Sequence, residues 1–353
     1  TVPDSQLRRE LHFKPRGIME ASIGFVRGCL VLVLAWAGFG YWALIAGVLF
    51  RELAVCLWVI VVRGLPRGVR WDSALYRQAI RFGIPATVSS IFWTIFSTAD
   101  KVVVGKLFGV DVLGYYAMAF YLTDLPLSKL NEVLNPVLTP YFSRLKSDMD
   151  SLRRAFLKIV GLVSLLMAPI LAGLAVVAPQ AVDVVLGEKW YALIAPLQVM
   201  CFVGLLRSLT GNVASLLYAI NKPGSVLRYN FICVLVLPAS FVLLGTWYGI
   251  SGVYGTWLVV FPFVSFYALT ILRRETEIAL RDYFSKVLPA IISSLFMALA
   301  VLGIKLIPSG HLTPALDLVL CVGIGAAIFA MTMWLVFRST VSEVLSAVRG
   351  LRN

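Results

Sequence analysis

Basic residues gather in every second one of the short segments that separate the long apolar stretches of this chain. Twenty-three of its 31 lysines and arginines occupy these alternate segments. They are Arg8, Arg9, Lys14, Arg16, Arg63, Arg67, Arg70, Arg77, Arg81, Arg144, Lys146, Arg153, Arg154, Lys158, Lys222, Arg228, Arg273, Arg274, Arg281, Lys286, Arg338, Arg349 and Arg352. Because membrane insertion retains basic loops on the cytoplasmic side, the alternation predicts a multi-pass membrane protein with both ends of this chain cytoplasmic.

The apolar stretches are long enough to be transmembrane helices, each of which needs about 20 residues. The chain is 60% hydrophobic and only 14% charged, a composition that excludes an ordinary soluble domain. We therefore predict an all-α polytopic membrane protein with about ten transmembrane helices. The predicted spans are 20–38, 41–63, 82–104, 113–143, 155–177, 190–220, 227–246, 250–272, 286–306 and 314–337.

Other functional classes find no support in the sequence. The net charge of +13 resides in the predicted cytoplasmic loops, so it does not indicate a nucleic-acid partner. The five cysteines lie inside apolar stretches without metal-binding spacing, and we expect neither a metal nor a cofactor. No P-loop, nucleophile elbow, zinc-protease motif or paired-carboxylate motif is present, so we predict that the protein is not an enzyme.

Two arginines fall deep inside the first two predicted helices, with acidic residues near them. Arg27 and Arg51 each lie twelve residues from Phe39 at the turn between those helices. At about 1.5 Å per residue, both lie about 18 Å from the turn and hence at the same depth. Glu52 and Glu20 are the nearby counter-ions. The group forms either an ion cluster that fixes the helix pair or a cationic patch that lines a pathway.

The fourth predicted span carries a stripe of polar residues at spacings of three and four. The stripe covers a sector about 80° wide on a helical wheel, with Glu132 at its margin. Its members are Tyr121, Asp124, Ser128, Asn131, Asn135 and Thr139. The stripe indicates either the wall of a wet cavity or a polar seam between helices. Pro126, Pro136 and Pro140 give this helix freedom to bend.

Charged residues in two further spans complete the set of candidates. Arg207 in the sixth span is a candidate cavity charge, so the predicted substrate-binding residues are Arg27, Arg51, Glu52, Tyr121, Asp124, Ser128, Asn131, Glu132, Asn135 and Arg207. Asp100 and Lys101 lie near the outer end of the third span, where we expect them to extend toward the membrane surface. Small residues recur on one face of the sixth span and predict close helix packing.

Several stretches resemble a known family of transporters. Residues 82–122 read FGIPATVSSIFWTIFSTADKVVVGKLFGVDVLGYYAMAFYL and contain the pattern ADxxxxGxxxGxxxLGYY. Residues 130–145, 186–200 and 217–230 extend the similarity along the chain. The sequence resembles the Wzx-type polysaccharide (O-antigen) flippases of the multidrug/oligosaccharidyl-lipid/polysaccharide exporter superfamily.

The resemblance implies a MATE-like architecture of two six-helix lobes followed by an extra helix pair. Mapped onto this chain, which begins at Thr1, it implies that about four N-terminal helices are missing. The implied parts are 1–63, the last two helices of the first lobe; 64–81, an amphipathic cytoplasmic linker; 82–272, the second lobe; 273–337, the additional pair; and 338–353, a cytoplasmic tail.

The resemblance also implies a function. It implies transport of undecaprenyl-diphosphate-linked oligosaccharide across the cytoplasmic (inner) membrane by alternating access, with membrane lipids, a polysaccharide polymerase and a chain-length regulator as partners. Arg27, Arg51 and Arg207 would attract the diphosphate, and the polar stripe would bind sugar hydroxyls. The alternatives are a multidrug or organic-cation exporter of the same superfamily and a membrane-embedded glycan polymerase or glycosyltransferase.

Overall fold

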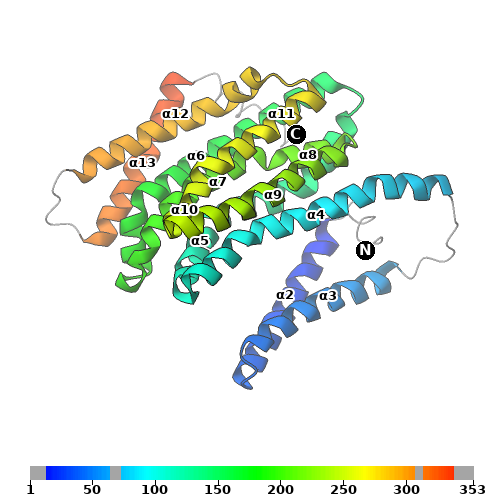
Figure 1. The fold of residues 1–353 in the computed structure, drawn as a ribbon, viewed down its shortest axis with the longest axis horizontal. Helices are drawn as coiled ribbons and strands as arrows, with labels where there is room; N and C mark the ends of the chain where they lie inside the picture. Colours follow the sequence, from blue (N-terminus) through cyan, green and yellow to red (C-terminus); the bar gives the residue numbers. More distant parts are fainter. Residues whose placement is uncertain (1–12, 64–72, 307–312, 338–353) are drawn as a thin grey trace. The chain divides into compact units, whose positions relative to one another are not determined.

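The computed structural model describes residues 13–63, 73–306 and 313–337 and is all-α over these ranges. Its helices are α2 (Phe13–Trp36), α3 (Tyr41–Arg63), α4 (Ser73–Phe108), α5 (Val110–Leu145), α6 (Met149–Val185), η1 (Glu188–Leu193), α7 (Ile194–Thr210), α8 (Asn212–Ala219), α9 (Pro223–Tyr248), α10 (Ile250–Gly255), η2 (Thr256–Val260), α11 (Phe261–Thr276), α12 (Leu280–Lys305) and α13 (Pro314–Val336) (Figure 1). The expectation of an all-α polytopic protein is confirmed.

Nine helical segments in the described ranges are long and apolar enough to cross a membrane. The one predicted span outside this set is the fourth, 113–143, which corresponds to α5; this helix has 36 residues but is too polar to meet the same criterion. The polar stripe and the charged residues beside it are the reason. Many large apolar side chains of the described residues are exposed, including Trp36 and Val110, as expected where lipid rather than water is the solvent.

The chain divides into two compact units between Arg77 and Gln78, within the segment predicted as a linker. However, α4 begins at Ser73, so residues 73–81 continue directly into the next helix instead of forming a separate surface segment. The rest of the predicted linker, 64–72, lies outside the described residues, as do the opening segment 1–12 and the predicted tail 338–353.

Two hairpin turns, one in each unit, share a pattern of small residues. Gly40, before α3, and Gly249, before α10, both have positive φ, 52° and 65°, which glycine adopts without strain. Three residues later a small residue is buried in each hairpin: Ala43 is 1% exposed, and a Cβ on Gly252 would overlap the Leu244 carbonyl of the preceding helix. In the second hairpin, the absence of a side chain at Gly252 lets the two helix ends approach closely.

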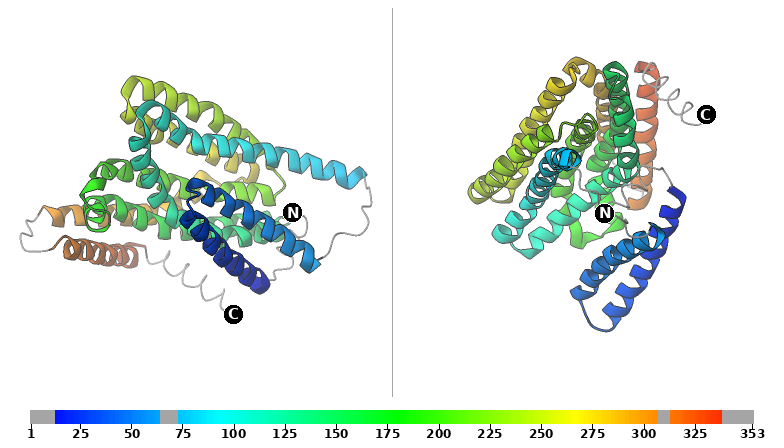
Figure 2. Two further views of the ribbon diagram at one scale, coloured as in Figure 1. Left: turned by 90° about the horizontal axis from the view of Figure 1, so that it is seen from below. Right: turned by 90° about the vertical axis from the view of Figure 1, so that its right-hand side faces the viewer.

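Helix α6 is the central packing element of the second unit, where α12, α7 and α13 lie against it (Figures 1 and 2). Polar contacts join three of these helices at one end. The Lys305 amine donates 2.6 Å to the Gln180 amide oxygen, and Gln180 donates 3.3 Å to the Asp317 carboxylate. The predicted additional helix pair is thus attached to the same bundle as the helices before it.

Two of the predicted spans depart from uniform α-helix. The span 190–220 comprises the 3₁₀ segment η1 and the helices α7 and α8, which follow each other with only Gly211 between them. The span 250–272 contains the π-helical segment η2 between α10 and α11. Such short π-helical insertions occur frequently at functional sites, and both irregularities lie beside the pocket described next.

Candidate functional site

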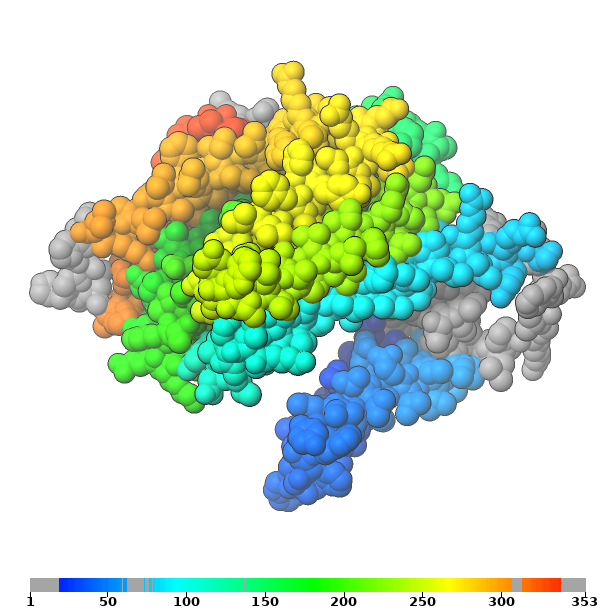
Figure 3. Space-filling view, viewed as in Figure 1, coloured from blue at the N-terminus to red at the C-terminus, as the bar shows by residue number. Residues whose placement is uncertain are grey.

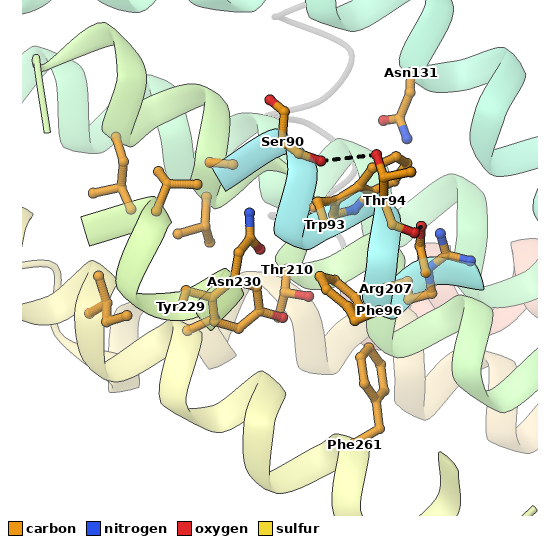
Figure 4. Close-up of a pocket in the computed structure, with 18 of the residues that line it drawn as sticks. Ser90, Trp93, Thr94, Phe96, Asn131, Arg207, Thr210, Tyr229, Asn230 and Phe261 are labelled. Carbon is orange, nitrogen blue, oxygen red and sulfur yellow. Dashed lines mark hydrogen bonds between the residues drawn. The ribbon is translucent and has the colours of Figure 1, made fainter. Parts of the chain in front are cut away.

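A hollow of about 550 Å³ lies inside the second unit, a volume typical of small-molecule sites. Helices α4, α5, α7, α8, α9 and α11 and the segment η2 all contribute to its wall. Figure 4 shows the polar side chains that surround it, with the Thr94 hydroxyl donating 2.9 Å to the Ser90 carbonyl. The polar members of the lining are Ser90, Thr94, Ser97, Asn131, Arg207, Thr210, Tyr218, Tyr229 and Asn230.

Arg207 supplies the positive charge of this pocket. Its guanidinium forms an ion pair of 3.1 Å with Asp124 of α5, and both side chains are partly exposed. The guanidinium carbon also lies 4.9 Å from the centre of the Phe120 ring, over which the Lys101 amine lies at 4.3 Å. Phe120 therefore holds two cations by cation–π contact beside the pocket.

The polar stripe of α5 is divided among several environments. Asn131 lines the pocket, and Asp124 reaches it through its ion pair with Arg207. Asn135 accepts a long hydrogen bond of 3.5 Å from Ser215 of α8, while Tyr121 is exposed. Each expected environment, cavity wall and helix seam, thus occurs along part of the stripe.

Ser128 of the stripe and Glu132 at its margin form their polar contacts with other residues of α5, as far as the described ranges show. The Ser128 hydroxyl donates 3.0 Å to the Leu125 carbonyl. Glu132 forms an exposed ion pair of 3.0 Å with Lys129. Neither side chain is part of the pocket lining.

The pocket is closed on one side by a buried contact between α4 and α9. The Asn230 amide donates 2.7 Å to the Ser89 hydroxyl and 3.0 Å to its carbonyl. On the face seen in Figure 3, α4, α9 and α11 form neighbouring ridges, and the contact lies between the first two. Asn230 was not among the predicted residues, because nothing in the sequence indicates its partner on α4.

Arg27, Arg51 and Glu52 belong to the first unit. The Arg51 guanidinium and Glu52 carboxylate form an exposed ion pair of 2.8 Å. Arg27 packs beside Gly47 of α3, where a Cβ would lie 3.6 Å from its side chain. Their predicted role in a transport pathway stays a prediction.

Asp100 does not extend to the membrane surface as expected, because its side chain is fully buried. The Tyr116 hydroxyl donates 2.7 Å to its Oδ2 atom, and the Trp257 indole donates 2.7 Å to that hydroxyl. Asp100 and Tyr116 stand near the two ends of the ADxxxxGxxxGxxxLGYY pattern. The turn at Gly109, with φ of 88°, brings α5 back along α4 so that the two residues meet.

A second hollow, of about 790 Å³, is lined by residues of α4, of the start of α9 and by Glu275 near the end of α11. Glu275 forms ion pairs there with Lys222 at 3.2 Å and Arg228 at 3.4 Å, and accepts 2.6 Å from the Ser225 hydroxyl. Arg81 also lines this hollow. The three basic residues belong to segments that the charge pattern assigns to the cytoplasmic side.

Membrane-crossing helices around a polar pocket that contains an arginine define an integral, multi-pass membrane protein. Residues 1–195, more than half of the chain, match the model of a family described as polysaccharide biosynthesis protein. The chain belongs to this family.

Individual relatives carry names from the same field. The lipopolysaccharide biosynthesis protein WzxC of Escherichia coli (strain K12) is 30% identical over 251 residues, which are 70% of this chain and 51% of that protein. The teichuronic acid biosynthesis protein TuaB of Bacillus subtilis (strain 168) is 23% identical over an alignment of 364 residues, which covers 96% of this chain and 71% of that protein.

A third relative is named as a transport protein. The succinoglycan biosynthesis transport protein ExoT of Rhizobium meliloti (strain 1021) is 23% identical over an alignment of 354 residues, which covers 99% of this chain and 71% of that protein. The chain therefore spans about half the length of the Escherichia coli relative and about 71% of the other two. No solved structure matches the chain.

Proposed function

We propose that this protein moves a polyprenyl-diphosphate-linked oligosaccharide across the cytoplasmic membrane during polysaccharide biosynthesis. The charged diphosphate and the sugars cannot cross hydrocarbon unaided, so a carrier must replace their water with polar groups. Alternating exposure of one internal site to the two sides is a common mechanism of such carriers. The names of the relatives support this class of cargo.

The observation that carries the proposal is the mixed lining of the pocket around Arg207. A guanidinium binds phosphate oxygens through paired N–H donors, and hydroxyl and amide groups bind sugar hydroxyls. The lining provides both kinds of group together with apolar surfaces from Phe96, Trp257 and Phe261. This combination suits a ligand that has a phosphate, a glycan and a lipid.

The same lining argues against an exporter of organic cations. Aromatic faces in the lining could contact a cation, but a site for organic cations also needs acidic groups that attract positive charge. Among the described residues, the lining of this pocket contains Arg207 and no carboxylate, and the neighbouring Asp124 is already paired with that arginine. The proposed cargo is accordingly anionic.

The experiment is complementation of a strain from which the gene has been deleted. Arg207→Glu places negative charge in the pocket and should abolish surface polysaccharide while lipid-linked repeats accumulate in the inner leaflet. Lys129→Glu is the matched control, because Lys129 is a cation on the neighbouring helix that is not part of the pocket lining. The proposal is wrong if Arg207→Glu, present in the membrane at normal amounts, exports as well as the control.

A further inference from the structure

Asp100 is a buried carboxylate that the binding of the cargo does not use. Its side chain is 0% exposed, and its Oδ1 atom has no hydrogen-bond partner within the described ranges. Its Oδ2 atom accepts 2.7 Å from the Tyr116 hydroxyl. An acidic side chain inside the membrane generally marks an ion or proton pathway, because its burial is costly.

The surroundings of Asp100 offset its charge only in part. The charged groups that act on it are the cations Lys101, on the same helix, and Arg207 of α7, which is itself paired with Asp124. No cation of the described residues forms an ion pair with Asp100. Tyr116 of α5 is the titratable group in contact with it, and Tyr254 of α10 acts in turn on Tyr116.

We propose that Asp100 takes up and releases the proton whose movement drives transport through the neighbouring pocket. This inference rests on the proposed function. In the uptake step one proton binds the free Oδ1 oxygen and converts the carboxylate to a neutral acid, and no other covalent bond changes. Release of the same proton on the other side of the membrane restores the carboxylate.

The nature of the neighbouring groups favours a proton over a divalent metal cation. Metal ions such as Ca²⁺ or Mg²⁺ require several oxygen ligands with free lone pairs. Here the Tyr116 hydroxyl donates its hydrogen to Asp100, and the Trp257 indole is a donor only. The described residues contain no cluster of three acidic, histidine or cysteine side chains suited to a metal.

A short hydrogen-bond chain connects Asp100 with the pocket. Trp257 lines the pocket and donates its indole hydrogen to Tyr116, which in turn donates to Asp100. Trp257 belongs to the π-helical segment η2, whose backbone differs from the helices on either side. A change in the charge of Asp100 therefore acts on a wall of the pocket through two hydrogen bonds.

The first test detects the proton itself and does not depend on transport. Infrared difference spectra of the purified protein between low and high pH should show the C=O band of a buried, protonated carboxyl group. The band should be absent from Asp100→Asn, whose amide oxygen still accepts from Tyr116. It should persist in Asp111→Asn, an exposed carboxylate on the same hairpin. A wild-type spectrum without a titrating band, or an unchanged band in Asp100→Asn, would overturn the proposal.

The second test measures coupling in vesicles that contain the purified protein and a labelled lipid-linked oligosaccharide. One coupled proton should change the steady-state ratio of cargo between the leaflets about tenfold for each pH unit across the membrane. Asp100→Asn should lose this dependence, and Asp111→Asn should keep it. If Asp100→Asn responds to the gradient like the wild type, Asp100 has a structural role only. If the wild type moves no cargo while the infrared band titrates, the proposed function fails and the proton site stands.

Discussion

Gly252 shows how a single missing side chain allows two helices to meet. A Cβ at this position would overlap the Leu244 carbonyl, which is backbone and cannot rotate away. Gly255, one turn further along, has no neighbouring atom within 4 Å of the place where a Cβ would be. The two glycines look equivalent in the sequence, yet only the first is required by packing.

Substitution of these two glycines should therefore have different effects. Gly252→Ala should destabilise the protein by about 3 kcal/mol, the upper end of typical overpacking costs, because the α9–α10 hairpin must open. Gly255→Ala should leave stability unchanged or slightly improved. Thermal unfolding of the two variants in detergent measures the difference, and equal melting temperatures would contradict the packing described here.

Asp100 is also the residue at which prediction from the sequence was least successful. Its position near the end of an apolar stretch suggested a side chain that reaches the membrane surface, whereas the structure buries it. The sequence nevertheless contains a signal for the contact between Asp100 and Tyr116. Asp100 is nine residues before Gly109 and Tyr116 is seven residues after it, so a hairpin at that glycine places them at similar depth.

At the scale of helices, the apolar stretches predicted which elements exist, and the structure refines their ends and interruptions. Length and hydropathy are sufficient for a membrane helix because every backbone polar group must be bonded within it. They do not predict the π-helical segment η2 or the early start of α4 at Ser73, since those depend on contacts with other helices. For the same reason the sequence offered Asn131 and Arg207 as candidates but not Asn230.

The contact between α4 and α9 is testable by a double-mutant cycle. Asn230→Ala and Ser89→Ala each remove one side of the buried hydrogen bond of 2.7 Å. Their coupling energy should be about 0.5–1.5 kcal/mol, the range typical of polar contacts between membrane helices. Unfolding of the wild type, both single variants and the double variant in detergent provides the measurement. A coupling energy of zero would mean that the bond does not hold α4 in place.

For the whole molecule, the charge pattern and the apolar stretches predict a multi-pass membrane protein, and the nine membrane-crossing segments of the described ranges agree with it. The cytoplasmic position of both ends, which only the charge pattern predicts, stays a prediction. The division into two units also falls within the segment predicted to separate two bundles. Two arginines of the first unit are also predicted to belong to the pathway. Arg51 is paired with Glu52, and Arg27 packs beside Gly47.

Charge reversal tests whether these arginines belong to the pathway. Arg27→Glu combined with Arg51→Glu should reduce export at least about tenfold, because a loss of about 1.4 kcal/mol in attraction for the diphosphate has that effect. The matched control is Arg27→Lys combined with Arg51→Lys, which keeps the charge and should retain most of the activity. Surface polysaccharide and membrane content of both variants are the measurements. Normal export by the charge-reversed protein would remove these residues from the pathway.

The central claim is that the cargo occupies the polar pocket of the second unit, and thiol labelling tests it most directly. In a variant without the five native cysteines, Thr94→Cys places a thiol in the pocket, and Val163→Cys places one in the packed core. We predict that a water-soluble thiol reagent labels Thr94→Cys in vesicles, that lipid-linked oligosaccharide blocks this labelling, and that Val163→Cys is not labelled. A Thr94→Cys variant that stays unlabelled on both sides of the membrane, or is labelled equally with and without the cargo, would contradict the account.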